Sequence, residues 1–446
     1  MFRSYILSSN HVAPATMSPR SRPVEPAQTP VGSDDDTDRG PTDPEDRVVS
    51  LDVLRGFALL GILVINIWLF ALPTIGWINP SLYGDFSGGN YVAWLVSHVF
   101  FEQKFITLFT FLFGAGIVLF TESKERKGQP ARRLHFRRTF WLLVIGLAHA
   151  YLLWHGDILV TYALCGFVVV FARNWRPKRL LVLGLILFML PTALYLLSGV
   201  GYTAADAETQ AEIEESILAG FGADSGAIDE EITAYQGGWV GQVEYRAPEV
   251  FTQQTLGFAF ELFWTVSGLM LIGMALYKWG VLSNERSTSF YRRLLAAGGL
   301  SGLTLILTGV WYREFIGWDT GYVLLFARQF NYVGSLLLAL GYVSLIMLLC
   351  RAAAGGRVAT ALSAVGRTAF SNYLFQTVVA TTIFYGHGLG LFATLSRLEL
   401  LGVVLLIWAI QIPLSIAWLN RFRFGPVEWL WRTLTYGSRQ PMRPES

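Results

Sequence analysis

The stretch LDVLRGFALLGILVINIWLFAL, residues 51–72, carries charge only at Asp52 and Arg55, close to its beginning. The rest is an apolar run of nearly the length, about 20 residues, that an α-helix needs to cross some 30 Å of hydrocarbon. The stretch therefore predicts a transmembrane helix, and similar segments recur along the chain. The ten predicted spans cover residues 51–72, 92–121, 138–154, 157–172, 179–199, 256–279, 294–311, 322–349, 362–386 and 399–419.

The second and eighth of these spans are too long for one straight crossing. Each is expected to be tilted, or to begin as an interfacial or re-entrant piece.

Composition supports the same fold class. Of the 446 residues, 53% are hydrophobic and only 15% are charged, whereas a soluble domain carries about 25% charged residues. The net charge of +2 and the lack of a basic patch interleaved with aromatic residues exclude nucleic acid as a partner. Cys165 and Cys350 lie in apolar stretches and have neither disulfide nor metal-site spacing. We expect an all-α, polytopic helical bundle surrounded by membrane lipids.

The loops orient this bundle. Alternate loops, together with the C-terminal tail, contain 23 lysines and arginines, and the loops between them contain three: Arg246, Arg313 and Arg397. Basic loops stay in the cytoplasm, so both termini are predicted to be cytoplasmic. We expect a multi-pass protein of the plasma membrane.

The domain organisation follows from the same pattern. Residues 1–46 are rich in Pro, Ser, Thr and Asp, without an apolar period, and are predicted to be a disordered cytoplasmic tail. Residues 47–436 are predicted to form one transmembrane domain, and residues 437–446 a short cytoplasmic tail. The longest external segment, about 200–255, is acidic. It is expected to form a short helix over the outer face, or else a solvated loop.

Charged and polar residues inside spans are candidate functional residues, because a charge in hydrocarbon costs several kcal/mol. Asp52 and Arg55 are three residues apart, hence on one helix face, and Asn66 lies three turns further along that face. They would face a polar interior, although an ion pair that anchors the helix end explains Asp52 and Arg55 equally well. Lys104 opens the second span.

Two further spans carry polar groups. His149 lies within the third span, and Asp157 is eight residues on, in a short turn. A neutral imidazole held by a carboxylate suits a general base near neutral pH; a hydrogen-bonded interior histidine is the alternative. Arg367, Asn372 and Gln376 lie in the ninth span, the last two on one face. Together these groups predict a polar cavity. The chain contains no HExxH or Walker motif, so neither a metal nor ATP is implied.

Six long motifs run along the chain: LDVLRGFALLGILVIN (51–66), KFITLFTFLFGAG (104–116), GLAHAYLLWHGDIL (146–159), GRTAFSNYLFQTVVATTIFY (366–385), LELLGVV (398–404) and FGPVEWLWR (424–432). Their order resembles the YeiB-like family of membrane proteins, the domain of unknown function numbered 418. The resemblance covers about residues 47–436 and leaves out the N-terminal tail.

That family in turn resembles a wider group of transmembrane acyltransferases. The group includes heparan-alpha-glucosaminide N-acetyltransferase and bacterial acyltransferases that decorate extracellular glycans. The shared pattern is Asp52, then Arg55-Gly56, then a polar residue, here Asn66. The glycan O-acyltransferases have a histidine near that last position, and the heparan-type branch has one shortly after it. Here the next histidine is His98, 32 residues on.

The resemblance therefore implies other site residues: His149, with Asp157, Lys104, Arg367, Asn372 and Gln376 as the cavity lining. It implies transfer of an acyl group from a cytoplasmic acyl-CoA-type donor to an extracytoplasmic glycan or lipid acceptor, with no tightly bound cofactor. His149 would be the general base and Asp157 would orient it.

The other groups would serve the same reaction. Asn372, Gln376 or Lys104 would stabilise the oxyanion. Arg55 and the arginines between the second and third spans would hold the donor's phosphates, although a topology signal alone explains those loop arginines better.

Two other functions fit ten helices. A transporter or lipid flippase would use Arg328, Glu261 and Lys104 to line a substrate path. A membrane scaffold is the third reading, but a scaffold needs few buried polar groups.

Overall fold

The computed structural model describes residues 48–222, 225–352 and 356–443, and every regular element in these ranges is a helix. The prediction of an all-α fold is therefore confirmed. The predicted disordered tail, residues 1–46, lies outside the described residues. Of the predicted C-terminal tail, residues 437–443 are described.

Within the described ranges, seven helical segments are long and apolar enough to cross a membrane: Val49–Ala71, Gly88–Arg126, Pro177–Ala204, Trp239–Lys278, Thr288–Phe315, Thr320–Ala352 and Arg397–Leu419. Among them, Val49–Ala71 is helix α1, Pro177–Ala204 is α7, Thr288–Phe315 is α12 and Arg397–Leu419 is α17. These segments confirm a polytopic membrane protein in coarse outline.

Three predicted spans correspond to helices that are too short or too polar to count as candidate membrane spans. The span at 138–154 lies in α5 (Ala131–Leu152), whose first two turns carry four arginines. The span at 157–172 corresponds to α6 (Leu159–Val169) with the short helix η3 (Val170–Ala172), and the span at 362–386 to α16 (Ala369–Phe384). These are about 14 and 16 residues long, shorter than the 20 or so of a full crossing. The count of ten stays a prediction.

The second predicted span is two helices. Helix α3 (Gly88–Phe100) ends, and α4 (Lys104–Arg126) begins after three non-helical residues. The last of these, Gln103, has a left-handed φ of 66°, which an L-residue adopts only where the surroundings enforce it. The excess length of the segment is therefore taken up by a break.

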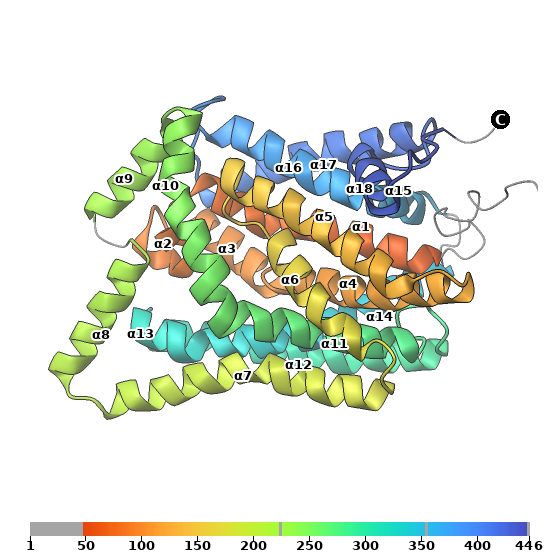
Figure 1. The fold of residues 1–446 in the computed structure, drawn as a ribbon. Helices are drawn as coiled ribbons and strands as arrows, with labels where there is room; N and C mark the ends of the chain where they lie inside the picture. The colour runs from red at the N-terminus through yellow and green to blue at the C-terminus, as the bar shows by residue number, and fades with distance from the viewer. Residues whose placement is uncertain (1–47, 223–224, 353–355, 444–446) are drawn as a thin grey trace, which may run out of the picture. The chain divides into compact units, whose positions relative to one another are not determined.

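The long helices run side by side and pack in pairs, notably α12 with α14 (Arg328–Ala352), α7 with α11 (Phe263–Lys278), and α1 with α15 (Arg357–Arg367) (Figure 1). Glycines permit the close approach. A Cβ added at Gly56 of α1 would lie 1.9 Å from the carbonyl oxygen of Leu362 on α15. Small residues at contacts between transmembrane helices have this role.

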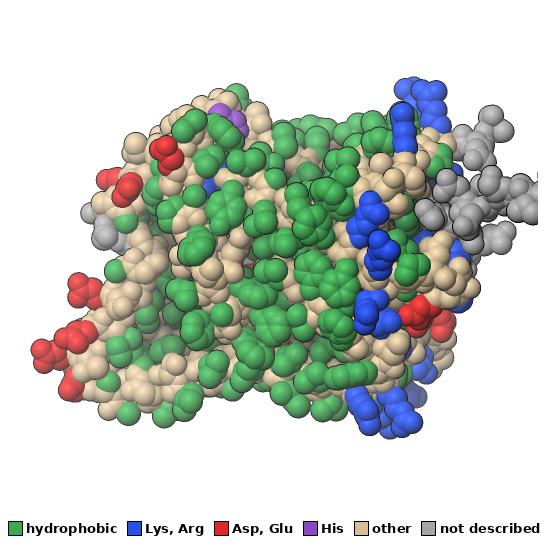
Figure 2. Space-filling view, in the orientation of Figure 1, with side chains coloured by type: hydrophobic (Ala, Val, Ile, Leu, Met, Phe, Trp, Pro, Cys, Tyr) green, Lys and Arg blue, Asp and Glu red, His purple; other side chains and the backbone are tan. Residues whose placement is uncertain are grey.

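Charged side chains gather at the two ends of the helix bundle, and a broad apolar band separates them (Figure 2). The basic end carries the exposed side chains of Arg132, Arg133, Arg179, Arg292, Arg293, Arg351 and Arg421. The acidic end carries Asp206, Glu208, Glu212, Glu215, Asp229 and Glu230. The apolar band is the surface expected to face lipid.

At the acidic end, segment 200–255 forms three helices where one short helix was expected. They are α8 (Ala207–Gly220), α9 (Ser225–Gln236) and α10 (Trp239–Thr252). Asp206 caps α8 by accepting a hydrogen bond from the Thr209 amide, at 2.8 Å. Helix α9 is docked through the buried Glu231, whose carboxylate accepts from the backbone N and the hydroxyl of Thr74, the first residue of α2 (Thr74–Ile78).

Candidate functional site

A cavity of about 810 Å³ lies among the helices. Along α1 its lining runs from Leu51 to Leu69, a helical length of about 27 Å at 1.5 Å per residue. This nearly equals the roughly 30 Å of a hydrocarbon core. Most of the lining is apolar. The polar and charged lining residues include Asp52, Arg55, Asn66, Glu102, Gln103, His135, Arg138, Asp157, Gln253, Glu261, Arg328, Arg367, Arg423, Glu428 and Arg432.

One end of this cavity is cationic. Five arginines line it, from α1, α5, α15 and the segment around α18 (Pro426–Tyr436): Arg55, Arg138, Arg367, Arg423 and Arg432. Two carboxylates accompany them. Asp52 is paired with Arg55 at 2.7 Å, and Glu428 accepts hydrogen bonds from the amides of Phe370 and Ser371, at 2.7 and 3.1 Å. The positive charges outnumber the negative ones, so this end suits an anion such as a phosphate.

Aromatic rings support two of these arginines. The guanidinium of Arg138 lies 4.3 Å from the Trp431 ring centroid, and that of Arg432 lies 4.5 Å from the Phe424 centroid. Such contacts orient the planar groups and stabilise them by about 0.5–2 kcal/mol. The arginines are thus held in place before any ligand arrives.

His149 and Asp157 meet as the sequence predicted. The Nδ1 atom of His149 lies 2.7 Å from Oδ2 of Asp157, and its Nε2 atom lies 2.9 Å from the hydroxyl of Thr377. A neutral imidazole satisfies both contacts when Nδ1 donates to Asp157 and Nε2 accepts from Thr377. The other Asp157 oxygen accepts from the Val160 amide at 2.9 Å. Asp157 lines the cavity, and His149 lies behind it, outside the lining.

The remaining predicted site residues divide in the same way. Asp52, Arg55, Asn66 and Arg367 line the cavity with Asp157. Lys104, Asn372 and Gln376 do not.

Asn372 and Gln376 instead join α16 to α17. The Asn372 amide donates to Ser415 at 2.9 Å, and the Gln376 amide donates to Gln411 at 3.0 Å. Their regular spacing reflects a hydrogen-bonded helix contact.

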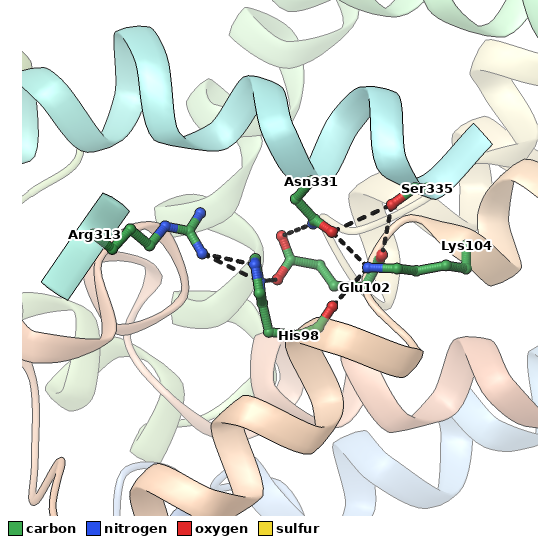
Figure 3. A network of polar contacts seen from close by, with 6 residues as sticks. All are labelled: His98, Glu102, Lys104, Arg313, Asn331 and Ser335. Atoms are coloured by element: carbon green, nitrogen blue, oxygen red, sulfur yellow. Dashed lines mark hydrogen bonds and ion pairs between the residues drawn. The ribbon is translucent and has the colours of Figure 1, made fainter. Parts of the chain in front are cut away.

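Lys104 belongs to a buried network at the break between α3 and α4 (Figure 3). Its ammonium donates to the His98 carbonyl at 2.6 Å and to Oδ1 of Asn331 at 2.5 Å. The Asn331 amide donates to Glu102 at 3.2 Å. Lys104 therefore satisfies a carbonyl that the end of α3 leaves without an intrahelical partner.

The same network fixes the tautomer of His98. Arg313 donates to Nε2 of His98 at 2.8 Å, so Nε2 is the unprotonated nitrogen, because a guanidinium cannot accept. Nδ1 then carries the proton and donates to Glu102 at 2.6 Å. Glu102 thus receives hydrogen bonds from two sides, and its side chain reaches the cavity wall.

Sequence reasoning missed much of the cationic end. Arg138 belonged to the loop arginines expected to hold the donor's phosphates, but Arg423 and Arg432 counted only as topology signals, and Glu428 was not singled out. The motif FGPVEWLWR contained the available signal, because Pro426 favours the first turn of a helix and places charged and aromatic residues together after the last span. In the described part of the chain no three His, Cys, Asp or Glu side chains converge as metal ligands.

The comparisons with known proteins agree with the resemblance. Residues 276–438 match the model of a family described as "Protein of unknown function (DUF418)". The chain is 33% identical to "Uncharacterized protein YeiB" of Escherichia coli K12 over 403 residues, 89% of this chain and 98% of that protein. It is also 33% identical to "Uncharacterized protein YxaH" of Bacillus subtilis 168 over 411 residues, 90% of this chain and 97% of that protein.

Proposed function

The chain belongs to the YeiB-like family of domain of unknown function 418, and from this premise we propose that it is a membrane acyltransferase. The donor is a cytoplasmic acyl-CoA-type thioester, and the acceptor is an extracytoplasmic glycan or lipid. The observation that carries the proposal is one cavity whose lining includes both the cationic end and Asp157, the partner of His149.

The cavity suits the two halves of such a donor. The arginines of the cationic end bind its phosphates, and the apolar lining receives the pantetheine arm and the acyl group. This assignment places the basic end of the bundle in the cytoplasm, as the basic loops predict.

The chemistry needs a base and an oxyanion donor. The acceptor hydroxyl or amine gives its proton to the Asp157–His149 pair while its oxygen or nitrogen bonds to the acyl carbon; the C–S bond then breaks, and the leaving thiolate takes that proton and departs as the thiol. Asp157 is the member of the pair that lines the cavity, although its side chain is only 1% exposed, so we place the entry of the proton at this residue, with His149 behind it. As oxyanion donor we propose Tyr373, which lines the cavity beside the His149 ring, instead of Asn372, Gln376 and Lys104, which do not line it.

Turnover in lipid nanodiscs tests this function. Purified protein receives a radiolabelled acyl-CoA and an extract of membrane lipids and glycans, and both thiol release and label transfer are measured. Asp157→Asn should lower transfer at least about 100-fold, within the range of general acid–base catalysis, and His149→Ala should abolish it. Asp85→Asn, at an exposed carboxylate outside the cavity, is the matched control. Full activity of Asp157→Asn would refute the assignment.

A second candidate is a transporter or lipid flippase. It is favoured by the break between α3 and α4, because discontinuous helices with charged residues at membrane depth are typical of transporter sites. The same preparation separates the two functions. A transporter gives no acyl-CoA turnover, and it moves a labelled anionic amphiphile across the membrane of a proteoliposome.

A further inference from the structure

Two π-helical segments meet at one ion pair inside the candidate membrane spans. The first, η4, covers Gln253–Leu262 and contains Glu261. The second, η5, covers Val323–Ala327 and ends immediately before Arg328. Because π-helical residues make up well under 1% of ordinary proteins and concentrate at functional sites, two such segments converging on one pair of charges point to a function.

The pair is closely bonded and reaches the cavity. Arg328 donates to Oε1 of Glu261 at 2.6 Å, and the hydroxyl of Tyr195 on α7 donates to Oε2 of Glu261 at 2.9 Å. Glu261 and Arg328 both line the cavity, and Tyr195 does not. The side chains of Glu261 and Arg328 are 23% and 24% exposed, so each keeps surface available to a ligand.

A purely structural tie between helices does not require this exposure. In the network around Glu102, the partners His98 and Lys104 are fully buried, and the Glu102 side chain, 21% exposed, is the part that reaches the cavity. The Glu261–Arg328 pair instead leaves part of both charged groups at a cavity wall inside the membrane, where ionisable residues mark substrate sites by default.

The chemistry of this wall differs from that of the cationic end. Its carboxylates are paired: Glu261 is bonded to Arg328, and Glu102, which also lines the cavity, is held by His98 and Asn331 beside the cations Lys104 and Arg313. The amide side chains of Gln103 and Gln253 and the hydroxyl of Thr265 line the cavity as well. These groups offer many hydrogen-bond donors and acceptors, and the carboxylates among them already have partners. They suit a neutral group with several hydroxyls better than a phosphate or an ammonium.

We propose that Glu261, Arg328 and the polar groups beside them form a subsite for an uncharged polyhydroxyl head group, of the sugar or glycerol type. The inference rests on the proposed function, because it assigns the acceptor's binding place in the same cavity. The head group belongs either to a lipid-linked molecule or to a free sugar.

Binding of simple probes tests the subsite without any turnover. Purified full-length protein in nanodiscs is titrated with radiolabelled octyl glucoside, octyl phosphate and octyl trimethylammonium at submicellar concentrations, with empty nanodiscs subtracted. Free glucose is the fourth probe, and it separates a free sugar from a lipid-linked one. We expect saturable binding of octyl glucoside that is weakened about tenfold or more by Glu261→Gln and by Arg328→Gln, because each removes a charge-assisted hydrogen bond.

Two controls separate binding from folding. Glu125→Gln alters an ion pair of the same kind, Arg173–Glu125 at 2.9 Å, that lies outside the cavity lining, and it should bind octyl glucoside normally. Tyr195→Phe removes a hydrogen bond to Glu261 from outside the cavity, so it should change thermal stability more than binding. If the single variants do not fold, the charge-exchanged double variant Glu261→Arg with Arg328→Glu restores the pair and should still bind octyl glucoside poorly.

Unchanged octyl glucoside binding in folded Glu261 and Arg328 variants would overturn the subsite, and so would a loss confined to octyl phosphate. The result is independent of catalysis. If acyl-CoA turnover is absent but octyl glucoside binding depends on Glu261 and Arg328, the subsite stands and the transferase function fails. If turnover is present but neither Glu261→Gln nor Arg328→Gln affects octyl glucoside binding, the transferase function stands and the subsite fails.

Discussion

Glu102, Lys104 and Arg313 bring three charges together at the break between α3 and α4, within candidate membrane spans. Ions buried this deeply are costly unless hydrogen bonds replace their hydration. Here neutral His98 accepts a hydrogen bond from Arg313 and donates one to Glu102, and Asn331 likewise accepts from Lys104 and donates to Glu102. The Lys104 ammonium also donates to the His98 carbonyl at the end of α3. The network therefore stabilises a break that an apolar helix would not tolerate in lipid.

Glu231 predicts a pH dependence at the acidic end. Burial raises the pKa of its carboxyl from 4.5 to about 7, with a smaller contribution from Glu249, although hydrogen bonds from Thr74 oppose the rise. The folded protein therefore holds the proton more tightly than the unfolded chain. This contribution to stability is fully present below about pH 4.5 and is lost as the pH rises through about 7.

Hydrogen exchange of the α9 amides between about pH 5 and pH 8, corrected for intrinsic rates, measures this effect. Protection should fall with rising pH in the natural protein, and Glu231→Gln should flatten the profile. Glu230→Gln, at the exposed neighbour, should retain the slope. An identical pH profile in Glu231→Gln would count against the assignment.

At the scale of elements, close contacts at glycines position the helices that carry the site. Helix α1 bears Asp52, Arg55 and Asn66, and its contact with α15 places Arg367 at the same cavity end. A Cβ at Gly366 would lie 1.9 Å from the Asp52 carbonyl oxygen, which is the counterpart of the Gly56 contact. The α1–α15 interface thus has no room for a methyl group on either side.

Gly56→Ala should consequently destabilise the protein by about 1–3 kcal/mol, the usual cost of overpacking. Gly402→Ala, on α17, is the matched control, because its added Cβ meets no atom within 4 Å. It should be neutral or stabilising by up to about 1 kcal/mol, since alanine favours a helix over glycine. Thermal unfolding of both variants in detergent measures the difference. Equal midpoints for the two variants would show that the interface relaxes.

The interruptions of the helices were less predictable than the helices themselves. The excess length of segments 92–121 and 322–349 indicated that something departs from a straight span, but the π-helices η4 and η5 have no local sequence signal. A π-helical turn adds one residue to the hydrogen-bonded ring of an α-helix, and this hardly changes the spacing of hydrophobic residues along the sequence. It is stabilised by contacts such as that between Arg328 and Glu261, which lie 67 residues apart.

For the whole molecule, the separation of charge predicts the orientation in the membrane. In a variant without Cys165 and Cys350, single cysteines are introduced at exposed positions on both ends. Ser289→Cys and Ser438→Cys belong to basic segments, and Ser87→Cys and Thr394→Cys to the opposite loops. A membrane-impermeant thiol reagent should label the last two in intact cells and the first two only after permeabilisation. The reverse labelling would contradict the positive-inside assignment.

The sequence alone determined that this is a helical membrane protein, which segments are apolar enough to be membrane spans, and that His149 could meet Asp157. These properties follow from composition, from period and from residues close in the chain, and each is a local quantity. Only the tertiary structure decided which polar residues share the cavity. Arg138, Arg432 and Glu261 line it, whereas Asn372 and Gln376 face a neighbouring helix. The rotation of each helix about its axis selects the residues that face inward, and packing against distant segments sets that rotation.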